Sequence, residues 1–205
     1  MPVRSLFATP VYVEPIAGSR GGSLNRRLLA ECRQLRHDDA AGRRWSRDRY
    51  PGGYTSYGSA SHMHRVSPTF AELERLIDGH VRRFARTLAF DLGGRRLAMT
   101  DCWVNLMPPG TGHGLHLHPL SALSGTYYVA TPRGSPGLKL EDPRLDRLMA
   151  APPRRADAPA DRRTWVVIPV RVGTLLLFES WLRHEVPVSR ARGERVSVSF
   201  NYGWN

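Results

Sequence analysis

The sequence has few cysteines and no long apolar run, and each of these absences excludes a class of protein. Its two cysteines, Cys32 and Cys102, are too few for a disulfide framework, so we expect a protein of the reducing cytoplasm. No apolar run is long enough to span a membrane, and the N-terminal residues lack the apolar core of a signal peptide. These observations predict a cytoplasmic protein with no membrane partner.

Lysine is also scarce, although the chain is strongly basic. The formal net charge is +12, and Lys139 is the single lysine among 30 basic residues. A charge of this size can indicate a nucleic-acid or anionic membrane partner. The arginines are scattered, however, and form no dense run with aromatic residues between them. We therefore expect no nucleic-acid partner, and we keep a non-catalytic, basic nucleic-acid-binding protein as the alternative from another functional class.

The N-terminal half of the chain carries helical patterns. Apolar residues recur at helical spacing over Leu24–Leu35 and Phe70–Leu88, and the Ser67-Pro68 pair marks the start of the second helix. The composition of Leu6–Val13 is typical of a strand. Between the helices, the polar and glycine-rich residues 38–61 predict a long loop, which is either a lid or binding loop or a plain surface excursion. Its aromatic part, Trp45–Tyr57, is the candidate lid over a substrate site.

From residue 97 onward the pattern is that of β-structure. Six strands are predicted, at Met99–Met107, Ser121–Thr131, Gly137–Glu141, Thr164–Val170, Gly173–Phe178 and Arg195–Tyr202. Helices first and strands second indicate an α+β, mainly β fold, a closed or two-sheet barrel with the helices packed outside. We expect a single domain, 1–205, with strand, helices and loop in 1–96 and the barrel core in 97–205.

A cluster of histidines precedes the second of these strands. Three of the eight histidines of the chain are found here, at positions His113, His116 and His118. Alternate residues of an extended segment point to the same side, so His116 and His118 can face one point together. Because imidazole is the commonest metal ligand at neutral pH, this pair predicts half of a metal site. His62 and His64 have the same spacing but stand just before a helix, and we expect both at the surface.

The C-terminal region adds a histidine and a buried cation to the candidate site. His184 follows an apolar strand, and ten residues separate it from Arg195. The last strand has an apolar face and a polar face, and the polar face consists of Arg195, Ser197, Ser199 and Asn201. A buried arginine needs an anionic partner, and its planar fork fits a carboxylate. No acid shares this face, so the partner is either a distant Asp or Glu or a bound carboxylate ligand.

Together these motifs resemble the Fe(II)- and 2-oxoglutarate-dependent oxygenases. The shared features are the His-x-His pair, the distal histidine and the Arg-x-Ser that follows after ten residues. More narrowly, most of the chain is similar to a group of bacterial 2-oxoglutarate/Fe(II) oxygenases. The matching stretches are LFATPVY, GGYTSY, CWVN, HLHPLSALSGTYYV, LKLEDPR, LLLFESWLRHEVP and RVSVSFNY. The resemblance implies a double-stranded β-helix, the cupin-like jelly-roll.

The resemblance also implies cofactors, site residues and a reaction. It names Fe(II) as the metal and 2-oxoglutarate as the co-substrate, and the implied metal ligands are His116, His118 and His184. Arg195 and Ser197 would bind the far carboxylate of 2-oxoglutarate, and Asn105 would contact the co-substrate. The implied reaction uses dioxygen and couples oxidative decarboxylation of 2-oxoglutarate to hydroxylation, or a related C–H oxidation, of an unknown small molecule or peptide.

The implied ligand set departs from the superfamily's usual two histidines and one carboxylate, because His118 stands where the carboxylate usually is. Asp142 and Glu141 are therefore kept as candidate carboxylate ligands. His113 is a candidate either to replace one histidine of the pair or to orient a ligand from behind. A three-histidine, cupin-like metalloenzyme that does not use 2-oxoglutarate is the second alternative function, although the Arg195 and Ser197 pair favours the oxygenase. The sequence leaves a homodimer open.

Overall fold

The computed structural model describes residues 3–16 and 22–204, and its elements follow the predicted order of helices and then strands. The helices are α1 (Ser23–Asp38), α2 (Ala40–Arg49), α3 (Met63–Val66) and α4 (Pro68–Thr87). The first strands are β1 (Tyr12–Pro15), β2 (Tyr54–Thr55), β3 (Leu97–Met107), β4 (His113–His116) and β5 (Leu123–Ala130). The later strands are β6 (Leu138–Glu141), β7 (Trp165–Ile168), β8 (Thr174–Glu179), β9 (His184–Val186) and β10 (Arg195–Trp204). Two short 3₁₀ helices, η1 (Leu145–Leu148) and η2 (Ala160–Arg162), lie between β6 and β7.

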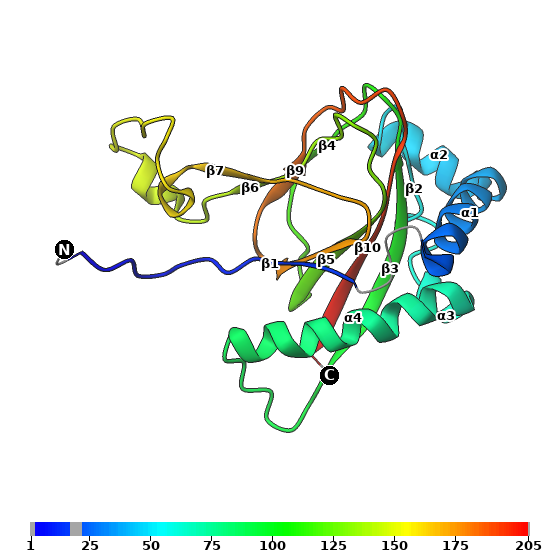
Figure 1. Ribbon diagram of the computed structural model, residues 1–205, viewed down its shortest axis with the longest axis horizontal. Helices are drawn as coiled ribbons and strands as arrows, with labels where there is room; N and C mark the ends of the chain where they lie inside the picture. Colours follow the sequence, from blue (N-terminus) through cyan, green and yellow to red (C-terminus); the bar gives the residue numbers. More distant parts are fainter. Residues whose placement is uncertain (1–2, 17–21, 205) are drawn as a thin grey trace.

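The strands form two sheets of antiparallel neighbours that face each other (Figure 1). The larger sheet has the order β1-β8-β5-β10-β3-β2, and the smaller one has the order β4-β9-β6-β7. From β3 to β10 the chain passes back and forth between the sheets, with the β6–β7 hairpin kept in the smaller one. This alternation is that of a double-stranded β-helix, so the predicted jelly-roll fold is confirmed.

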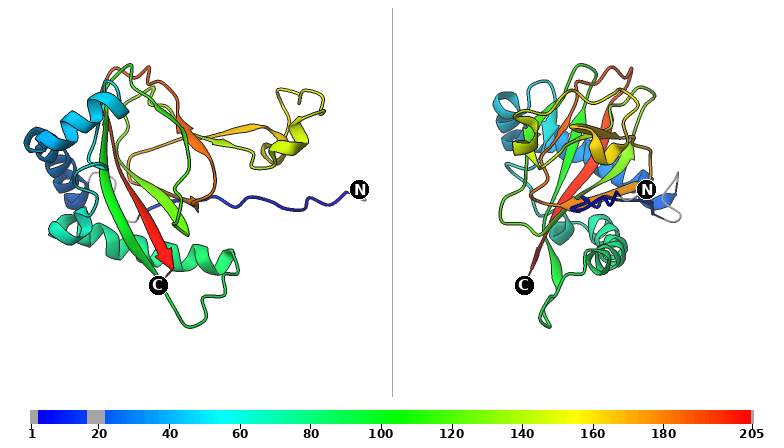
Figure 2. Two further views of the ribbon diagram at one scale, coloured as in Figure 1. Left: turned by 180° about the vertical axis from the view of Figure 1, so that it is seen from behind. Right: turned by 90° about the vertical axis from the view of Figure 1, so that its left-hand side faces the viewer.

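Helices α1 and α4 cover the outer face of the larger sheet (Figure 2). Their apolar stripes, which include Leu28 of α1 and Phe70 of α4, pack against the apolar face of β10. Ser67 accepts hydrogen bonds from the backbone N–H groups of Thr69 and Phe70, and Pro68 occupies the first turn, as predicted. The main hydrophobic core therefore lies between the helices and the larger sheet, outside the barrel. No helix in the described part of the chain is long and apolar enough to cross a membrane.

The opposite faces of the same strands line the interior of the barrel. A second, smaller apolar cluster there includes Tyr128 of β5, Leu138 of β6 and Phe178 of β8. The polar face of β10 also turns inward, so Arg195 and Ser197 are buried within the barrel. The predicted division of the last strand into a core face and a site face is thus correct, and it places the polar residues between the two sheets.

Some local predictions were wrong or incomplete. Residues 38–61 are not one loop: they contain α2, whose N-terminus is capped by the Asp39 carboxylate accepting from the N–H of Gly42, and β2. The strand predicted at Leu6–Val13 begins only at Tyr12, because no neighbouring strand pairs with the residues before it. Strands β4 and β9 are absent from the prediction, since four and three residues are too few to show an alternating pattern.

Candidate metal centre and co-substrate pocket

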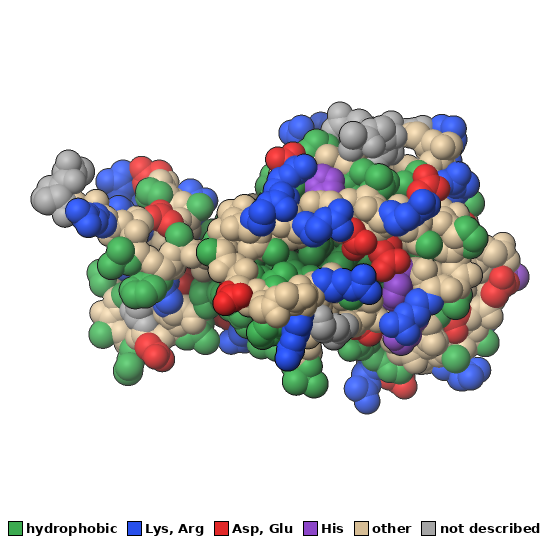
Figure 3. All heavy atoms as spheres, turned by 90° about the horizontal axis from the view of Figure 1, so that it is seen from below, with side chains coloured by type: hydrophobic (Ala, Val, Ile, Leu, Met, Phe, Trp, Pro, Cys, Tyr) green, Lys and Arg blue, Asp and Glu red, His purple; other side chains and the backbone are tan. Residues whose placement is uncertain are grey.

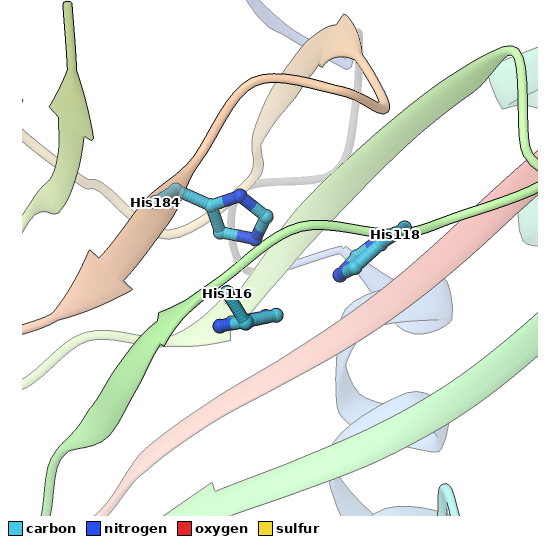
Figure 4. Close-up of side chains that lie close together, drawn as sticks. All are labelled: His116, His118 and His184. Carbon is cyan, nitrogen blue, oxygen red and sulfur yellow. The ribbon is translucent and has the colours of Figure 1, made fainter. Parts of the chain in front are cut away.

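Three histidines from two neighbouring segments of the smaller sheet converge inside the barrel (Figure 4). His116 ends β4, His118 follows two residues later, and His184 begins β9 directly opposite His116 in the register of the two strands. Each offers one ring nitrogen, and these atoms all lie within 4.8 Å of one another. In the part of the chain that the structure describes, this is the one group of histidine, cysteine and acidic side chains that could hold a metal ion.

An irregularity in β4 brings a fourth imidazole to the cluster. The register of β4 against β9 shifts between His113 and His116, as it does at a β-bulge. Two residues that are three positions apart would face opposite sides of a regular strand, but here the ring centroids of His113 and His116 are 4.2 Å apart. His113 also meets the ring of Tyr50 edge-on, with centroids 5.0 Å apart. His113 therefore lies beside the cluster, where it supports the His116 ring.

Hydrogen bonds to Nδ1 set the orientation of all three converging rings. The carbonyl oxygen of Gly114 lies 2.7 Å from Nδ1 of His116, and that of Leu182 lies 2.9 Å from Nδ1 of His184. A carbonyl oxygen only accepts, so both Nδ1 atoms carry the proton and both Nε2 atoms keep a free lone pair. Nδ1 of His118 is 2.7 Å from Oδ1 of Asn201, which plays the same part. Such partners fix the tautomer and the direction of a metal-binding imidazole.

Burial keeps these histidines neutral near pH 7. It lowers the pKa of His184 to about 3 and that of His118 to about 4, with the neighbouring His116 adding to both shifts. The pKa of His116 is also lowered by burial, and the pKa of His113 falls to about 3 for the same reason. A neutral imidazole is the form that binds a metal ion, so the cluster is ready for a metal without first losing protons.

Arg195 is buried in the same pocket without a carboxylate partner. Its side chain is 2% exposed, and its guanidinium carbon lies over the ring of Tyr128, 5.0 Å from the centroid. Nη1 contacts only the sulfur of Met107 at 3.1 Å and the hydroxyl of Ser197 at 3.4 Å, and Nε has no partner among the described residues. No ion pair to this guanidinium is found in the described part of the chain. An unpaired buried cation is costly, so the pocket fits an anionic ligand.

All six predicted site residues line one pocket between the two sheets. Besides the three histidines these are Asn105, Arg195 and Ser197. The amide nitrogen of Asn105 donates to Ser199, 3.1 Å away, while its Oδ1 is buried and has no partner among the described residues. A buried polar atom normally has a hydrogen-bond partner, so this atom is free to receive one from a ligand.

The structure also separates the two candidate carboxylate ligands, Asp142 and Glu141, from the cluster. The carboxylate of Asp142 is buried against Arg144, with Oδ1 3.0 Å from Nε, and Glu141 pairs with Arg183. Neither belongs to the group that could hold a metal ion. His64, predicted at the surface, is buried, because α3 holds it against the end of the larger sheet. His64 is not a member of the histidine cluster.

Three aromatic residues of the pocket were not identified from the sequence. Tyr50 and Trp103 line it, and Tyr128 supports the guanidinium of Arg195. Trp103 also contacts the His118 ring, with centroids 5.6 Å apart. The alternation of β3 provides a signal for Trp103, because it shares a face with Asn105. No sequence pattern identifies Tyr50 as a pocket residue, because it lies in a stretch predicted as a loop, far from the barrel strands in sequence.

A match to a protein-family model identifies the class of protein to which the chain belongs. Residues 101–201 match the family described as "Putative 2OG-Fe(II) oxygenase". The chain belongs to the 2-oxoglutarate/Fe(II) oxygenase family. It is accordingly an Fe(II)- and 2-oxoglutarate-dependent enzyme, and the matched range contains all six predicted site residues. This favours the oxygenase over the cupin-like and nucleic-acid-binding alternatives. No curated protein matches the chain.

Solved structures share the fold at low sequence identity. A prolyl-4-hydroxylase from Pseudomonas putida is 17% identical, with 95% of this chain and 92% of that one covered and a TM-score of 0.60. The epimerase SnoN, crystallised with Fe³⁺, alpha ketoglutarate and nogalamycin RO, is 16% identical, with 95% and 79% covered and a TM-score of 0.63. HygX from Streptomyces hygroscopicus, crystallised with nickel, 2-oxoglutarate and hygromycin B, is 16% identical, with 95% and 83% covered and a TM-score of 0.61. At these identities the likeness concerns the fold alone.

Proposed function

We propose that this enzyme hydroxylates, or otherwise oxidises at a C–H bond, a small molecule or peptide, and that it couples this step to oxidative decarboxylation of 2-oxoglutarate. The observation that carries the proposal is the pairing of two features in one pocket. Three imidazoles present free Nε2 atoms to one point, and a buried guanidinium without a carboxylate partner faces the same space. We further propose that the whole chain, 1–205, is one oxygenase domain.

The three histidines are the proposed Fe(II) ligands. Their donor set suits a divalent transition metal, because neutral imidazole is a ligand of intermediate softness that iron accepts. When bound, Fe(II) and 2-oxoglutarate supply the oxidising chemistry, in which dioxygen is consumed, carbon dioxide is lost and one oxygen atom becomes available to the substrate. The protein's part is to hold the imidazoles in one orientation, through the acceptors Gly114, Asn201 and Leu182.

Arg195, Ser197 and Asn105 are the proposed co-substrate ligands. The guanidinium of Arg195 would pair with the carboxylate at the far end of 2-oxoglutarate, and the Ser197 hydroxyl beside it would donate a further hydrogen bond. 2-Oxoglutarate has only acceptor oxygens, so Asn105 would contact it through its amide NH₂, with the amide turned so that Oδ1 accepts from the Ser199 hydroxyl instead. Because this pocket is buried, a charge pair formed in it is stronger than the same pair in water. Phe178 packs edge-on to His184, 4.7 Å between centroids, and helps to exclude water.

The replacement of a carboxylate by His118 changes the charge of the site. Three neutral imidazoles leave the full positive charge of a divalent metal, whereas a carboxylate ligand would cancel one unit of it. Arg195 adds another positive charge within the same pocket. A doubly negative 2-oxo acid would therefore enter a site whose charge favours it more than the usual triad does. This supports 2-oxoglutarate as co-substrate despite the unusual ligand set.

The test is an anaerobic titration of metal-free protein with Fe(II) and then 2-oxoglutarate, following the visible absorption band that forms when a 2-oxo acid chelates ferrous iron. The same titration is made with His118→Ala, with Arg195→Ala and with Glu185→Gln as control. Glu185 adjoins His184 but pairs with Lys139 outside the cluster. We expect a saturable band in the wild type and the control, no band in His118→Ala, and a band that needs far more 2-oxoglutarate in Arg195→Ala.

Two results would contradict the proposal. Tight metal binding without a band would mean that the site holds a metal but not a chelating 2-oxo acid, as in a cupin-like enzyme. A band of equal strength in His118→Ala would mean that this histidine is not a ligand. If the band forms as expected, release of succinate in the presence of candidate substrates identifies the class of molecule that is oxidised.

A further inference from the structure

A second, larger cavity adjoins the metal pocket along the smaller sheet. It has a volume of about 640 Å³, in the range of known ligand sites. Leu138 of β6 lines the metal pocket, and Leu140, two residues on and on the same face of that strand, lines the cavity. Leu140 is directly opposite His184 in the register of β6 and β9, and Leu182, whose carbonyl orients His184, also lines the cavity. The cavity therefore opens beside the proposed metal ligands.

The other wall of this cavity is the N-terminal segment Val3–Thr9. Every residue of that segment lines the cavity. The segment extends away from the barrel on the same side as the β6–β7 hairpin (Figures 1 and 2). The cavity therefore lies between this segment and the facing strands β6 and β7.

The N-terminal wall has hydrogen-bonding groups to spare. No backbone N–H or C=O group of Val3–Thr9 is hydrogen-bonded to another described residue, and one side-chain bond, from Ser5 to Asp161, joins the segment to the opposite wall. Large apolar side chains of the segment are also left without packing: Leu6 is 65% exposed and Phe7 is 84% exposed. The backbone bends at Phe7, where φ is +57°, so the extended part is Val3–Leu6. Unpaired backbone groups in an extended segment can pair with a further strand.

We infer that this cavity binds the oxidised substrate, and that the substrate is a peptide whose backbone pairs with the extended residues Val3–Leu6 as a short added strand. The inference rests on the proposed function, because it places the peptide next to the proposed metal ligands. The aliphatic floor formed by Leu140, Val166 and Ile168 would receive apolar side chains. Pairing through the main chain supplies affinity, and the alternate side chains that meet this floor supply specificity.

The charges at the outer end of the cavity favour an acidic peptide. Four arginines line the cavity against three carboxylates, an excess of one positive charge. Within the lining Arg144 pairs with Asp142, and Glu141 pairs with Arg183 outside it. The arginines are Arg4, Arg144, Arg162 and Arg163. On the face seen from below, basic and acidic side chains are interspersed and form no single basic patch (Figure 3). The peptide that fits best is therefore apolar near the metal pocket and acidic at its outer end.

Binding can be measured without turnover on the full chain loaded with Mn(II) and 2-oxoglutarate. Two synthetic libraries of short peptides are offered, both with apolar centres, one with acidic ends and one with basic ends. Retained peptides are identified by mass spectrometry, and amide hydrogen exchange is followed in the N-terminal segment. The variant is Val166→Glu, which puts a charge on the cavity floor. The matched control is Val167→Glu on the outer face of the same strand, where Val167 is 54% exposed.

We expect the acidic library to be retained by the wild type and by Val167→Glu, and to bind Val166→Glu about tenfold more weakly or worse, because an unpaired carboxylate resists burial under the peptide. Peptide binding should also slow amide exchange in Val3–Leu6, a signal that a change in folding alone would not give. Retention of neither library, retention unaffected by Val166→Glu, or unchanged exchange in the segment would each overturn the peptide assignment. So would displacement of bound peptide by dodecanoate at equal concentration, which would indicate an acyl-chain site.

The experiments can contradict the proposed function and the peptide inference independently of each other. Binding of 2-oxoglutarate is checked first by the absorption band of the Fe(II) protein, and its absence in the wild type would contradict the proposed function. In that case the peptide-retention and amide-exchange measurements still report whether the cavity binds a peptide, since they do not need turnover. Normal 2-oxoglutarate binding in Val166→Glu shows that this variant is folded, so weaker peptide retention then reports on the cavity.

Discussion

The amide oxygen of Asn201 accepts a hydrogen bond from Nδ1 of His118 over 2.7 Å, although 83 positions separate the two residues in the chain. Asn201 lies on β10 in the middle of the larger sheet, whereas His118 follows β4 of the smaller sheet. The same oxygen accepts from Ser124 at 2.8 Å, and the amide nitrogen of Asn201 points to Asp101, 3.4 Å away. One asparagine therefore connects the proposed third metal ligand to the rigid part of the barrel.

Removing this connection should weaken metal binding without removing a ligand. In Asn201→Ala the His118 ring loses one of the two partners of its Nδ1 and keeps the Ser124 hydroxyl, 2.8 Å away, so we expect the affinity for Fe(II) or Mn(II) to fall by roughly 10-fold. Isothermal titration calorimetry under anaerobic conditions measures this change. Ser180→Ala is the control, because the Ser180 hydroxyl contacts Ser124 at 2.7 Å but not the histidine itself. Equal affinities for Asn201→Ala and the wild type would show that Asn201 does not orient a ligand.

Arg195→Met should separate stability from co-substrate binding. The guanidinium is buried and has no ion pair among the described residues, so replacing it with an apolar side chain of similar length removes an uncompensated charge. We expect the thermal unfolding temperature without 2-oxoglutarate to stay level or rise, while the affinity for 2-oxoglutarate falls by about 30-fold or more. Calorimetry and thermal unfolding give the two values.

The exposed residue Arg82 supplies the control for this prediction. Arg82→Met removes the same charge from the surface of α4 and should leave both measurements near the wild-type values. Strong destabilisation of Arg195→Met would indicate that Arg195 has an internal partner that stabilises the fold. Unchanged 2-oxoglutarate affinity would instead show that the far carboxylate binds elsewhere.

Stability should depend on pH through His64. Burial, with Arg65 and His62 nearby, lowers the pKa of His64 in the folded state below its ordinary value near 6.5. The unfolded chain then binds more protons at acidic pH, so the free energy of unfolding is highest above pH 6.5 and falls as the pH drops below it, by at most about 1.4 kcal/mol per pH unit for one group. Urea unfolding at pH 5 and pH 7.5 should show a smaller pH effect in His64→Phe than in the wild type. The control is His37→Phe, the same substitution at an exposed histidine. An identical pH effect in His64→Phe and the wild type would refute the prediction.

Two glycines, one in each sheet, should respond differently to a methyl group. A Cβ on Gly125 of β5 would lie 2.6 Å from the carbonyl oxygen of Leu176 and 2.6 Å from the ring of Phe200, and neither atom can move freely inside the core. We expect Gly125→Ala to lower the free energy of unfolding by roughly 1–3 kcal/mol. A Cβ on Gly114 of β4 meets nothing within 4 Å, so Gly114→Ala should change it by less than about 0.5 kcal/mol. Urea unfolding compares the two, and equal effects would contradict this reading of the packing.

The fold was accessible from the sequence where the pattern is long and regular. In β10 the residues Arg195–Tyr202 alternate between a polar face and an apolar face, and the alternation assigned Val198 to the core and Ser197 to the site. α4 carries both a cap and a long apolar stripe, and its start and extent are as predicted. Short or partnerless elements were not accessible: β9 has three residues, and the strand composition of residues 6–11 lacks a partner strand.

The metal site shows the same limit at the level of single residues. The spacing of His116 and His118 is local, so the sequence predicted that both can face one point. The position of His113 depends on a bulge in β4, and the inclusion of Tyr50 depends on how the turn after α2 packs against the barrel. Neither follows from a repeating pattern, because a bulge and a packed turn are set by the neighbouring strand and by the space available.

The sequence by itself determined the order of helices and strands, the polar face of the last strand and the residue types that bind a metal and a carboxylate. These depend on interactions between residues close in the chain and on chemistry that each side chain carries with it. Only the tertiary structure decided that His184 stands opposite His116, that Arg195 is buried without a carboxylate partner among the described residues, and that Val3–Thr9 lines a cavity beside the cluster. These relationships join segments far apart in the sequence, and the pairing and burial that create them exist only once the two sheets have closed on each other.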